Sequence, residues 1–366
     1  MHLGVLQEMK FMAANHSMQD LLMRQEPLLA LAPMQDITDL PFWRLLAARG
    51  GPDVYWTEYF RVTATWRPEK WILRSLVENP TGRPAVAQLI GNDPQALARA
   101  ARELQHYPIA AIDLNLGCPA PVVYRKCAGG GLLRDLARVD SVLGSLRDAV
   151  KTRFTVKTRI GFQDPAEFEQ VLSVFAKHPL DLVTVHGRTV AEMYRSEVHY
   201  DVIARAVSAL SCPVLANGNV DSPERASCIL QATGAKGLMI GRGCIRNPWL
   251  FDQIRAHLQG REVFFPRGRD VLSYIEDLWI ATEPPDSKER LQVEQMKRYV
   301  NFIGQGVGSE PSTAQDFLHR IRRTSNRVDF FAICREFLDH SDLMPLRPHP
   351  TVAAVKNEIP LEPAAA

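Results

Sequence analysis

Short apolar runs alternate with amphipathic stretches along residues 28–240. The runs are typical of strands buried on both faces of a parallel sheet, and the stretches between them have helical spacing. Eight such units favour a closed (β/α)8 TIM barrel over an open doubly wound sheet. The predicted strands are Leu28–Ala32, Val54–Thr57, Ala85–Leu89, Ala110–Leu114, Phe154–Lys157, Leu182–His186, Val214–Ala216 and Gly237–Ile240.

Helices are predicted between these strands, and two of them begin with capping residues. Asp93 precedes Pro94, and Ser222 precedes Pro223, which is the order expected at a helix N-terminus. The predicted helices are Pro94–His106, Val139–Val150, Pro165–Lys177, Val202–Leu210 and Pro223–Ala232.

The pattern changes near residues 261–269, after which helical stretches follow one another without strands. They are Val271–Thr282, Lys288–Ile303, Thr313–Thr324 and Asp329–His340. We therefore expect a C-terminal all-helical domain over residues 261–345, after a barrel over residues 27–260. Residues 1–26 are predicted to be a peripheral extension, and the proline- and alanine-rich residues 346–366 a loosely ordered tail.

Composition limits the class of protein. With 43 basic and 41 acidic residues the formal charge is +2, so any nucleic-acid surface must be a local patch. The six cysteines form no CxxC pair, which favours a reducing compartment and predicts neither disulfides nor a metal site. No apolar run is long enough to span a membrane, and charged residues interrupt the N-terminus where a signal peptide would be apolar. We expect a cytoplasmic protein.

Polar residues gather where the predicted strands end, which is the edge that carries the active site in barrel enzymes. The segment Ile112–Pro119 is the most informative of these. Pro119 restricts Cys118 to an extended conformation, which would hold the thiol at the mouth of the barrel. A free cysteine is more often a small buried hydrophobic residue. We interpret Cys118 as a catalytic acid.

Further features at the strand ends indicate an anionic ligand. Glycines in Asn217–Asn219 and Gly241–Gly243 can bring backbone N–H groups close to a phosphate, although each could be an ordinary turn. A charge at Lys157 or Arg159 inside the barrel would be costly unless paired, either with a bound anion such as a reduced flavin or with a carboxylate of the barrel. His186 is either a core histidine or, with Arg188 beside it, part of a loop that faces a ligand.

Two basic segments are candidates for binding a polyanion. The glycine-rich loop 120–131 carries Arg125 and Lys126, and could be a mobile cover or an ordinary solvated loop. In the helical domain, Lys297 and the run 319–323 concentrate positive charge. Such a run alone is usually a solvated helix face, and becomes a candidate phosphate-backbone patch only beside a redox barrel.

Together these motifs resemble the tRNA-dihydrouridine synthase family over residues 28–338. The resemblance rests on Ala32-Pro33-Met34 with Ile37-Thr38-Asp39, Asp113-x-Asn115-x-Gly117-Cys118-Pro119, Arg125-Lys126 with Ala128-Gly129, Val156-Lys157-x-Arg159-x-Gly161, Val185–Thr189, Asn217-Gly218-Asn219 and Gly241-Arg242-Gly243. It implies an FMN-containing barrel and a helical tRNA-binding domain. It also implies reduction of a D-loop uridine by FMN, with NADPH as the reductant, in a protein we expect to be monomeric.

The resemblance also implies roles for individual residues. Cys118 would be the proton donor. FMN would be bound by Pro33, Met34, Gln35, Gln88, Lys157, His186, Asn217, Gly218, Asn219, Gly241 and Arg242. Asn115 and Arg159 would hold the uracil, and further contacts with tRNA would come from Arg188, Tyr194, Arg125, Lys126, Lys297, Arg320, Arg322 and Arg323.

One position departs from the family pattern, because Pro121 stands where many members have a lysine. The segment 57–62 resembles the bacterial subfamily that modifies position 16 of the D-loop. Two alternatives remain at this level: an FMN barrel acting on a small molecule, of the dihydroorotate dehydrogenase type, and a non-catalytic RNA-binding barrel. No GxGxxG segment follows a strand, so NADPH rests on the resemblance alone.

Overall fold

The computed structural model describes residues 18–282 and 288–349, which form two compact units. The first unit contains residues 52–218 and 228–240 and the chain up to Leu40. The second contains residues 41–51 and 219–227 and the chain from Gly241 onward. Residues 241–260 thus group with the helical region rather than with the barrel to which the sequence assigned them. The reason is local: Arg246, in helix α10 (Arg242–Arg246), is buried and donates to Phe302 O and Gln305 Oε1.

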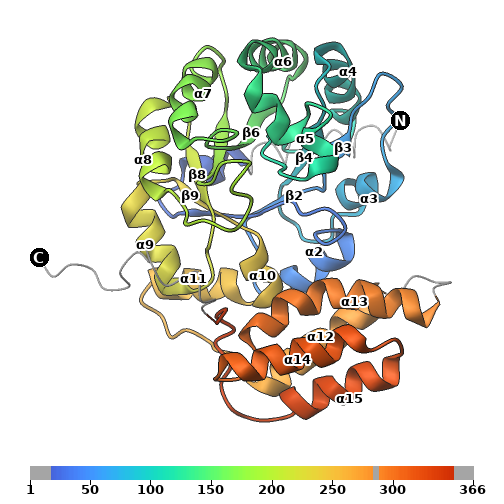
Figure 1. Ribbon diagram of the computed structural model, residues 1–366. Helices are drawn as coiled ribbons and strands as arrows, with labels where there is room; N and C mark the ends of the chain where they lie inside the picture. The colour runs from blue at the N-terminus through green and yellow to red at the C-terminus, as the bar shows by residue number, and fades with distance from the viewer. Residues whose placement is uncertain (1–17, 283–287, 350–366) are drawn as a thin grey trace, which may run out of the picture. The chain divides into compact units, whose positions relative to one another are not determined.

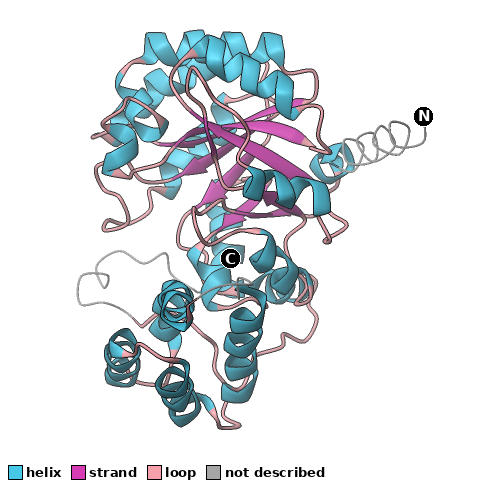
Figure 2. Ribbon diagram, turned by 90° about the vertical axis from the view of Figure 1, so that its right-hand side faces the viewer, coloured by secondary structure: helices cyan, strands magenta, loops and turns pink. Residues whose placement is uncertain are grey.

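Eight parallel strands of the first unit close into a barrel (Figures 1 and 2). Each pairs with the next, and β1 pairs with β9 to complete the circle, which confirms the predicted TIM barrel. A two-residue strand, β3 (Phe60–Arg61), is added on the edge of β4. The barrel strands are β1 (Leu28–Leu31), β2 (Val54–Trp56), β4 (Ala85–Ile90), β5 (Ala111–Leu116), β6 (Arg153–Arg159), β7 (Leu182–His186), β8 (Val214–Asn217) and β9 (Gly237–Ile240).

Helices cover the outside of this barrel, and they include those that the sequence predicted between the strands (Figure 2). Asp93 caps α4 by accepting from the backbone N–H groups of Gln95 and Ala96, as its position before Pro94 suggested. The helices of this unit are α3 (Lys70–Glu78), α4 (Pro94–Leu104), α5 (Pro121–Tyr124), α6 (Leu136–Ala149), α7 (Phe168–Phe175) and α8 (Tyr200–Ala209), with 3-10 turns at Gly129–Arg134 and Pro165–Glu167. Two further helices, α2 (Leu40–Ala47) and α9 (Pro223–Thr233), cross the division between the units.

The barrel interior is apolar at one end of the strands and polar at the other. Side chains two residues apart share a face, so each strand contributes an alternating inward series. The series run from apolar residues such as Val86, Ala111 and Leu215 to Gln88, Asp113 and Asn217. The polar end is the carboxyl end of the strands, where the candidate site lies.

Part of the N-terminal segment belongs to this core. Met18 is fully buried among inward-facing strand residues, with Leu21 and Leu22 packed against the same cluster. The extension predicted to be peripheral is therefore integral to the barrel from residue 18, because its apolar side chains fill the end of the barrel opposite the polar one. Residues 1–17 lie outside the described residues.

The second unit contains the predicted helical region. Its main helices are α11 (Leu250–Leu258), α12 (Gly268–Thr282), α13 (Glu289–Ile303), α14 (Pro311–Arg323) and α15 (Arg327–Leu338). Buried aromatic rings hold α12 against α15, since Trp279 lies 5.3 Å from Phe331 between ring centroids. At the start of the predicted tail, Leu346 is buried and Arg347 pairs with Glu224, whereas residues 350–366 lie outside the described residues.

Candidate active site

Cys118 lies just after β5, in a loop that a single side chain holds. Asn115 Oδ1 accepts hydrogen bonds from the backbone N–H groups of Gly117 and Cys118, at 3.0 and 2.9 Å. The Cys118 carbonyl in turn accepts from Gly130 N at 3.1 Å. The thiol therefore belongs to a fixed loop at the polar end of the barrel, as the sequence predicted.

The Cys118 side chain is half-buried. Burial raises the pKa of the thiol above its usual 9.0, and this effect outweighs the opposing influence of Lys157 and Arg159. The thiol is thus protonated at neutral pH. This is the state a proton donor needs, and the reverse of the lowered pKa of a nucleophilic cysteine.

The glycines at the end of loop 120–131 are closely packed. A Cβ on Gly129 would lie 3.0 Å from the Cys118 Cβ, and one on Gly131 only 2.4 Å from Tyr124 O. Gly129 also has φ +55°. Close packing is therefore sufficient to explain why these positions are glycine. The sequence had suggested instead that they let the loop move as a cover. The Arg125 and Lys126 side chains in the same loop are exposed.

Below Cys118 lies a chain of buried polar side chains. Gln88 and Asp113 are fully buried. Asp113 accepts from Thr155 Oγ1 at 2.5 Å and from Gln88 Nε2 at 2.8 Å, and Asn115 Nδ2 donates to Gln88 Oε1 at 2.8 Å. Burial raises the pKa of Asp113 to about 6, with smaller lowering contributions from Thr155, Gln88, Trp56 and Lys157. The carboxyl is therefore mostly ionised at pH 7.

Lys157 faces Asn115 across the β5–β6 ladder. Its Nζ donates to Asn217 Oδ1 at 3.2 Å. Burial and, to a smaller extent, Arg159 lower the pKa of Lys157 to about 8, although the Asp113 carboxylate partly compensates. Since no carboxylate within 4 Å is paired with Lys157 in the described part of the chain, the ammonium group has capacity for an anionic ligand.

Arg159, predicted to hold uracil, is almost fully buried. Its guanidinium donates to the carbonyls of Gly117, Thr189 and Met193, at 3.0, 2.7 and 2.6 Å. It therefore ties the Cys118 loop to the loop after β7. Contact between Arg159 and uracil stays a prediction, because its guanidinium N–H groups donate to backbone carbonyls in this structure.

His186 and Arg188, at the end of β7, are also buried. Arg188 Nη1 lies 3.2 Å from His186 Nε2, and Arg188 Nε donates to Ser196 O at 2.8 Å. Because a guanidinium only donates, Nε2 of the histidine accepts and the ring proton lies on Nδ1. Tyr194, by contrast, is about half exposed, and the Arg159 guanidinium lies 5.2 Å from its ring centroid.

The loop after β1 brings Met34 and Gln35 to the same end of the barrel. Its turn is closed by hydrogen bonds from Ile37 N and Thr38 N to Met34 O, and Asp36 has φ +61°. Gln35 Oε1 is buried and has no hydrogen-bond partner within the described residues. An unpaired buried acceptor fits a bound group that carries an N–H donor.

Glu58 is a site residue that the sequence analysis did not assign. It is buried, and its carboxylate accepts from the Asp36 backbone N–H, which fixes the turn after β1. Burial, with a smaller contribution from Asp39, raises the pKa of Glu58 to about 7. Its position two residues after Trp56, on the inward side of β2, was the available signal.

The predicted phosphate contacts fall on both sides of the division between the units. In the first unit, Asn217 Nδ2 donates to Met239 O at 2.8 Å and Gly218 has φ +135°. In the second, Arg242 Nη2 donates to Asn219 Oδ1 at 3.4 Å. A Cβ on Gly243 would lie 2.1 Å from Val220 O, so packing alone requires that glycine.

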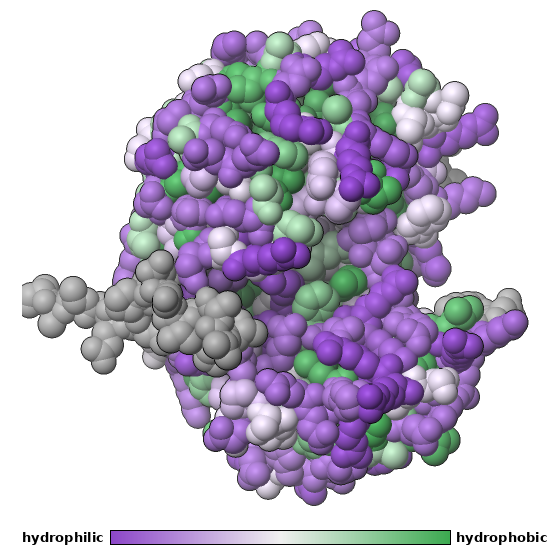
Figure 3. All heavy atoms as spheres, in the orientation of Figure 1, coloured by the Kyte–Doolittle hydropathy of each residue, from purple (hydrophilic) through white to green (hydrophobic). Residues whose placement is uncertain are grey.

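The basic residues of the helical region differ in their hydrogen-bond partners. Arg320 makes a bidentate ion pair with Glu336 of α15, whereas Arg322 donates to Asn301 of α13. Residues two apart on a helix point to nearly opposite sides. Lys297 pairs with Glu294, and Arg323 is exposed. The face in Figure 3 is mostly hydrophilic, with apolar residues scattered among polar ones.

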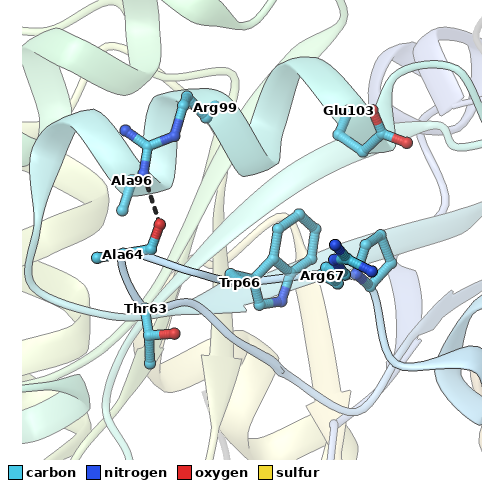
Figure 4. Close-up of a pocket in the computed structure, with 8 residues that line it drawn as sticks. Thr63, Ala64, Trp66, Arg67, Ala96, Arg99 and Glu103 are labelled. Atoms are coloured by element: carbon cyan, nitrogen blue, oxygen red, sulfur yellow. Dashed lines mark hydrogen bonds between the residues drawn. The ribbon is translucent and has the colours of Figure 1, made fainter.

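A surface pocket of about 360 Å³ lies away from the predicted residues (Figure 4). It is formed by the segment after β3 and by α4, where Arg99 donates to Ala64 O at 3.1 Å and Trp66 lines one side. None of the predicted catalytic or cofactor residues lines it. Residues 18–282 and 288–349 contain no cluster of three metal-ligating side chains and no helix long and apolar enough to cross a membrane.

Comparison with known proteins gives the family. A sequence model described as dihydrouridine synthase (Dus) matches residues 30–276. The chain belongs to the dihydrouridine synthase family. It is 38% identical over 231 residues to tRNA-dihydrouridine synthase B of Pseudomonas syringae pv. tomato, covering 63% of this chain and 68% of that one. It is 36% identical over 283 residues to a probable tRNA-dihydrouridine synthase of Rickettsia prowazekii, covering 76% and 80%.

Membership of the dihydrouridine synthase family confirms the resemblance seen in the motifs and makes the protein a tRNA-modifying oxidoreductase. The names of these relatives give no tRNA position, so the expectation of position 16 stays a prediction. Among solved structures, a 6-hydroxypseudooxynicotine amine oxidase from Pseudomonas geniculata N1 has a TM-score of 0.50 at 12% identity. The match covers 64% of this chain and 48% of that one, and it shows a shared fold alone.

Proposed function

We propose that this dihydrouridine synthase reduces one uridine in the D-loop of tRNA to 5,6-dihydrouridine, with FMN as cofactor and NADPH as reductant. The observation that carries the proposal is the Cys118 thiol, held at the barrel mouth by Asn115 and kept protonated by burial. Reduction of the C5=C6 bond needs a hydride at C6 and a proton at C5. Cys118 is suited to give the proton.

The residues at the polar end of the barrel fit a flavin. Within the described part of the chain, Lys157 offers a cation with no carboxylate bound to it, and Gln35 offers a buried acceptor that lacks a donor. FMN would be held there by Pro33, Met34, Gln35, Gln88, Lys157, His186 and Asn217, and its phosphate by Gly218, Asn219, Gly241 and Arg242. When bound, FMN supplies the hydride and receives two electrons from NADPH.

The chain's own residues account for the proton transfer. The Cys118 S–H bond breaks as a C–H bond forms at uracil C5, and the thiolate left behind is stabilised by Lys157 and Arg159, which both lower its pKa. Solvent then reprotonates the sulfur. Asn115 and Arg159 hold the loop that sets the position of the thiol.

Exposed basic side chains outside the barrel mouth would contact the tRNA. The exposed Arg125 and Lys126 side chains are suited to bind RNA phosphates, and so is Arg323. Tyr194, Arg188, Lys297, Arg320 and Arg322 would contribute further contacts. The target base must leave its stack to reach Cys118, which costs a few kcal/mol and favours a nucleotide in a loop.

Mapping dihydrouridine by position in tRNA from a deletion strain tests the function and fixes the target. We expect one D-loop position to lose dihydrouridine, and position 16 is the prediction. Purified enzyme should also oxidise NADPH with unmodified tRNA and not with small pyrimidine acceptors such as orotate. A deletion strain with a complete dihydrouridine pattern would contradict the proposal.

A further inference from the structure

The side chains of Asp113, Gln88 and Asn115 form a buried chain of hydrogen bonds. All donors in this hydrogen-bond chain point the same way, because one end can only accept hydrogen bonds and the other end can only donate them. An ionised carboxylate only accepts hydrogen bonds, and backbone N–H groups only donate. Asp113 forms one end, and the N–H groups of Gly117 and Cys118 form the other. Two side-chain amides connect them, each with its nitrogen toward Asp113 and its oxygen toward the Cys118 loop.

This direction determines what the two amides can offer a ligand. Gln88 Nε2 uses one hydrogen on Asp113, and Asn115 Nδ2 uses one on Gln88 Oε1. Asn115 Oδ1 already accepts two N–H groups. The capacity that remains on Asn115 is therefore one N–H hydrogen, whereas Gln88 keeps one N–H hydrogen and one lone pair on Oε1. Asn115 is set to donate.

We propose that Asp113 is a positioning residue that sets this polarity, so that Asn115 presents a hydrogen-bond donor to a carbonyl oxygen of the substrate base. This rests on the proposed function. Uracil carries carbonyl oxygens at C2 and C4, whereas cytosine has an amino group in place of the second. A fixed donor thus favours uracil wherever it faces O4.

Thr155 is the reason that charge and polarity can be tested separately. Its hydroxyl donates to Asp113 Oδ1, but a hydroxyl can also accept. In Asp113→Asn, the new amide can keep its oxygen toward Gln88 and turn its nitrogen toward Thr155. The charge is lost while the direction of the chain is kept, so this variant is the matched control.

Asn115→Asp breaks the chain. Both ends would then be carboxylates, and Gln88 would have to point its oxygen at one of them. The double variant Asp113→Asn/Asn115→Asp restores the two hydrogen bonds among the side chains at positions 113, 88 and 115 in the opposite direction. The new amide at position 113 would donate to Gln88, and Gln88 would donate to the new carboxylate at position 115. That carboxylate would still accept the Gly117 and Cys118 N–H groups. Size and net charge are those of the native pair.

The experiment compares these three variants with the native enzyme by thermal midpoint, FMN retained on purification and dihydrouridine formed in tRNA by the pre-reduced enzyme. We expect Asp113→Asn to stay within about 10-fold of native activity. Asn115→Asp should lose stability and FMN. The double variant should regain stability and yet reduce uridine at least about 100-fold more slowly, because an acceptor now faces the base carbonyl.

Two results would overturn the proposal. A double variant as unstable as Asn115→Asp would show that the amides are not coupled, and one with native uridine reduction would show that polarity is irrelevant. If Asn115→Asp does not fold, the double variant is compared with Asp113→Asn instead. A folded double variant with much slower uridine reduction than Asp113→Asn would support the proposal, and equal rates would overturn it. Stability and FMN retention need no RNA, so a native enzyme inactive on tRNA would refute the proposed function and leave these readouts interpretable.

Discussion

The barrel mouth and the helical region both carry charged residues, but they hold them in opposite ways. At the mouth, Asp113, Glu58 and Lys157 are desolvated and their pKa values are displaced toward neutrality. In the helical region, Arg320 and Glu336 pair at the surface, where water screens the interaction. Burial therefore shifts the pKa values of the charged groups at the barrel mouth. In the helical region, solvent weakens the interaction between the charged groups.

The largest effect should come from removing the proton donor. Cys118→Ala should lower dihydrouridine formation by about 10²–10⁴-fold, because general acid catalysis contributes that much. FMN retention and NADPH oxidation with an artificial acceptor should persist. Liquid chromatography of digested tRNA measures the product. Cys127→Ala, an exposed thiol of the same loop, is the control and should be near native. Normal product from Cys118→Ala would refute the acid assignment.

Glu58 offers a test of desolvation at the mouth. Its native pKa of about 7 lies above the usual value of 4.5, so the native state keeps its proton to higher pH than the unfolded chain. Stability from this group is therefore complete below about pH 4.5 and falls as pH rises to about 7, by roughly 3 kcal/mol.

In Glu58→Gln this pH-dependent loss should disappear. Denaturant unfolding at pH 5 and pH 8 should show a smaller decrease in the free energy of unfolding for the variant than for the native protein. Glu78→Gln, a partly exposed helix residue, is the control. Identical pH profiles for Glu58→Gln and the native protein would mean that Glu58 titrates in the ordinary range.

Lys157→Ala should weaken FMN retention or slow flavin reduction by about 10-fold, since it removes a desolvated cation worth one charge-assisted hydrogen bond. Absorbance at 450 nm after dialysis and stopped-flow reduction by NADPH would measure the two effects. Lys151→Ala, an exposed residue near the opposite end of β6, should leave both unchanged. A fully yellow and fully active Lys157→Ala enzyme would contradict the role proposed for this lysine.

The smallest effects should come from the helical region. Arg323→Ala should weaken tRNA binding a few-fold and reduce the salt dependence by about one phosphate contact. Arg320→Ala should change tRNA binding less, because Glu336 already neutralises Arg320. Filter binding at several salt concentrations measures both. Equal losses for the two variants would show that the Glu336 pair opens when RNA binds.

The sequence by itself determined the barrel, the helical region and the strand ends at which the candidate site lies. Periodicity was sufficient because a strand buried on both faces must be apolar, so the polar positions Gln88, Asp113 and Asn115 stood out in their strands. Pro119 and the motif glycines marked Cys118 in the same way. These are local signals, readable along one stretch of chain.

Only the tertiary structure decided what the polar residues do to one another. Asn115 was expected to hold uracil, and the fold also makes it the cap of the Cys118 loop and the partner of Gln88. Arg159 was expected at the base and is bonded to three carbonyls. Met18 was expected at the periphery and fills the core. Hydrogen-bond direction and burial depend on residues far apart in the chain, which periodicity along one strand does not contain.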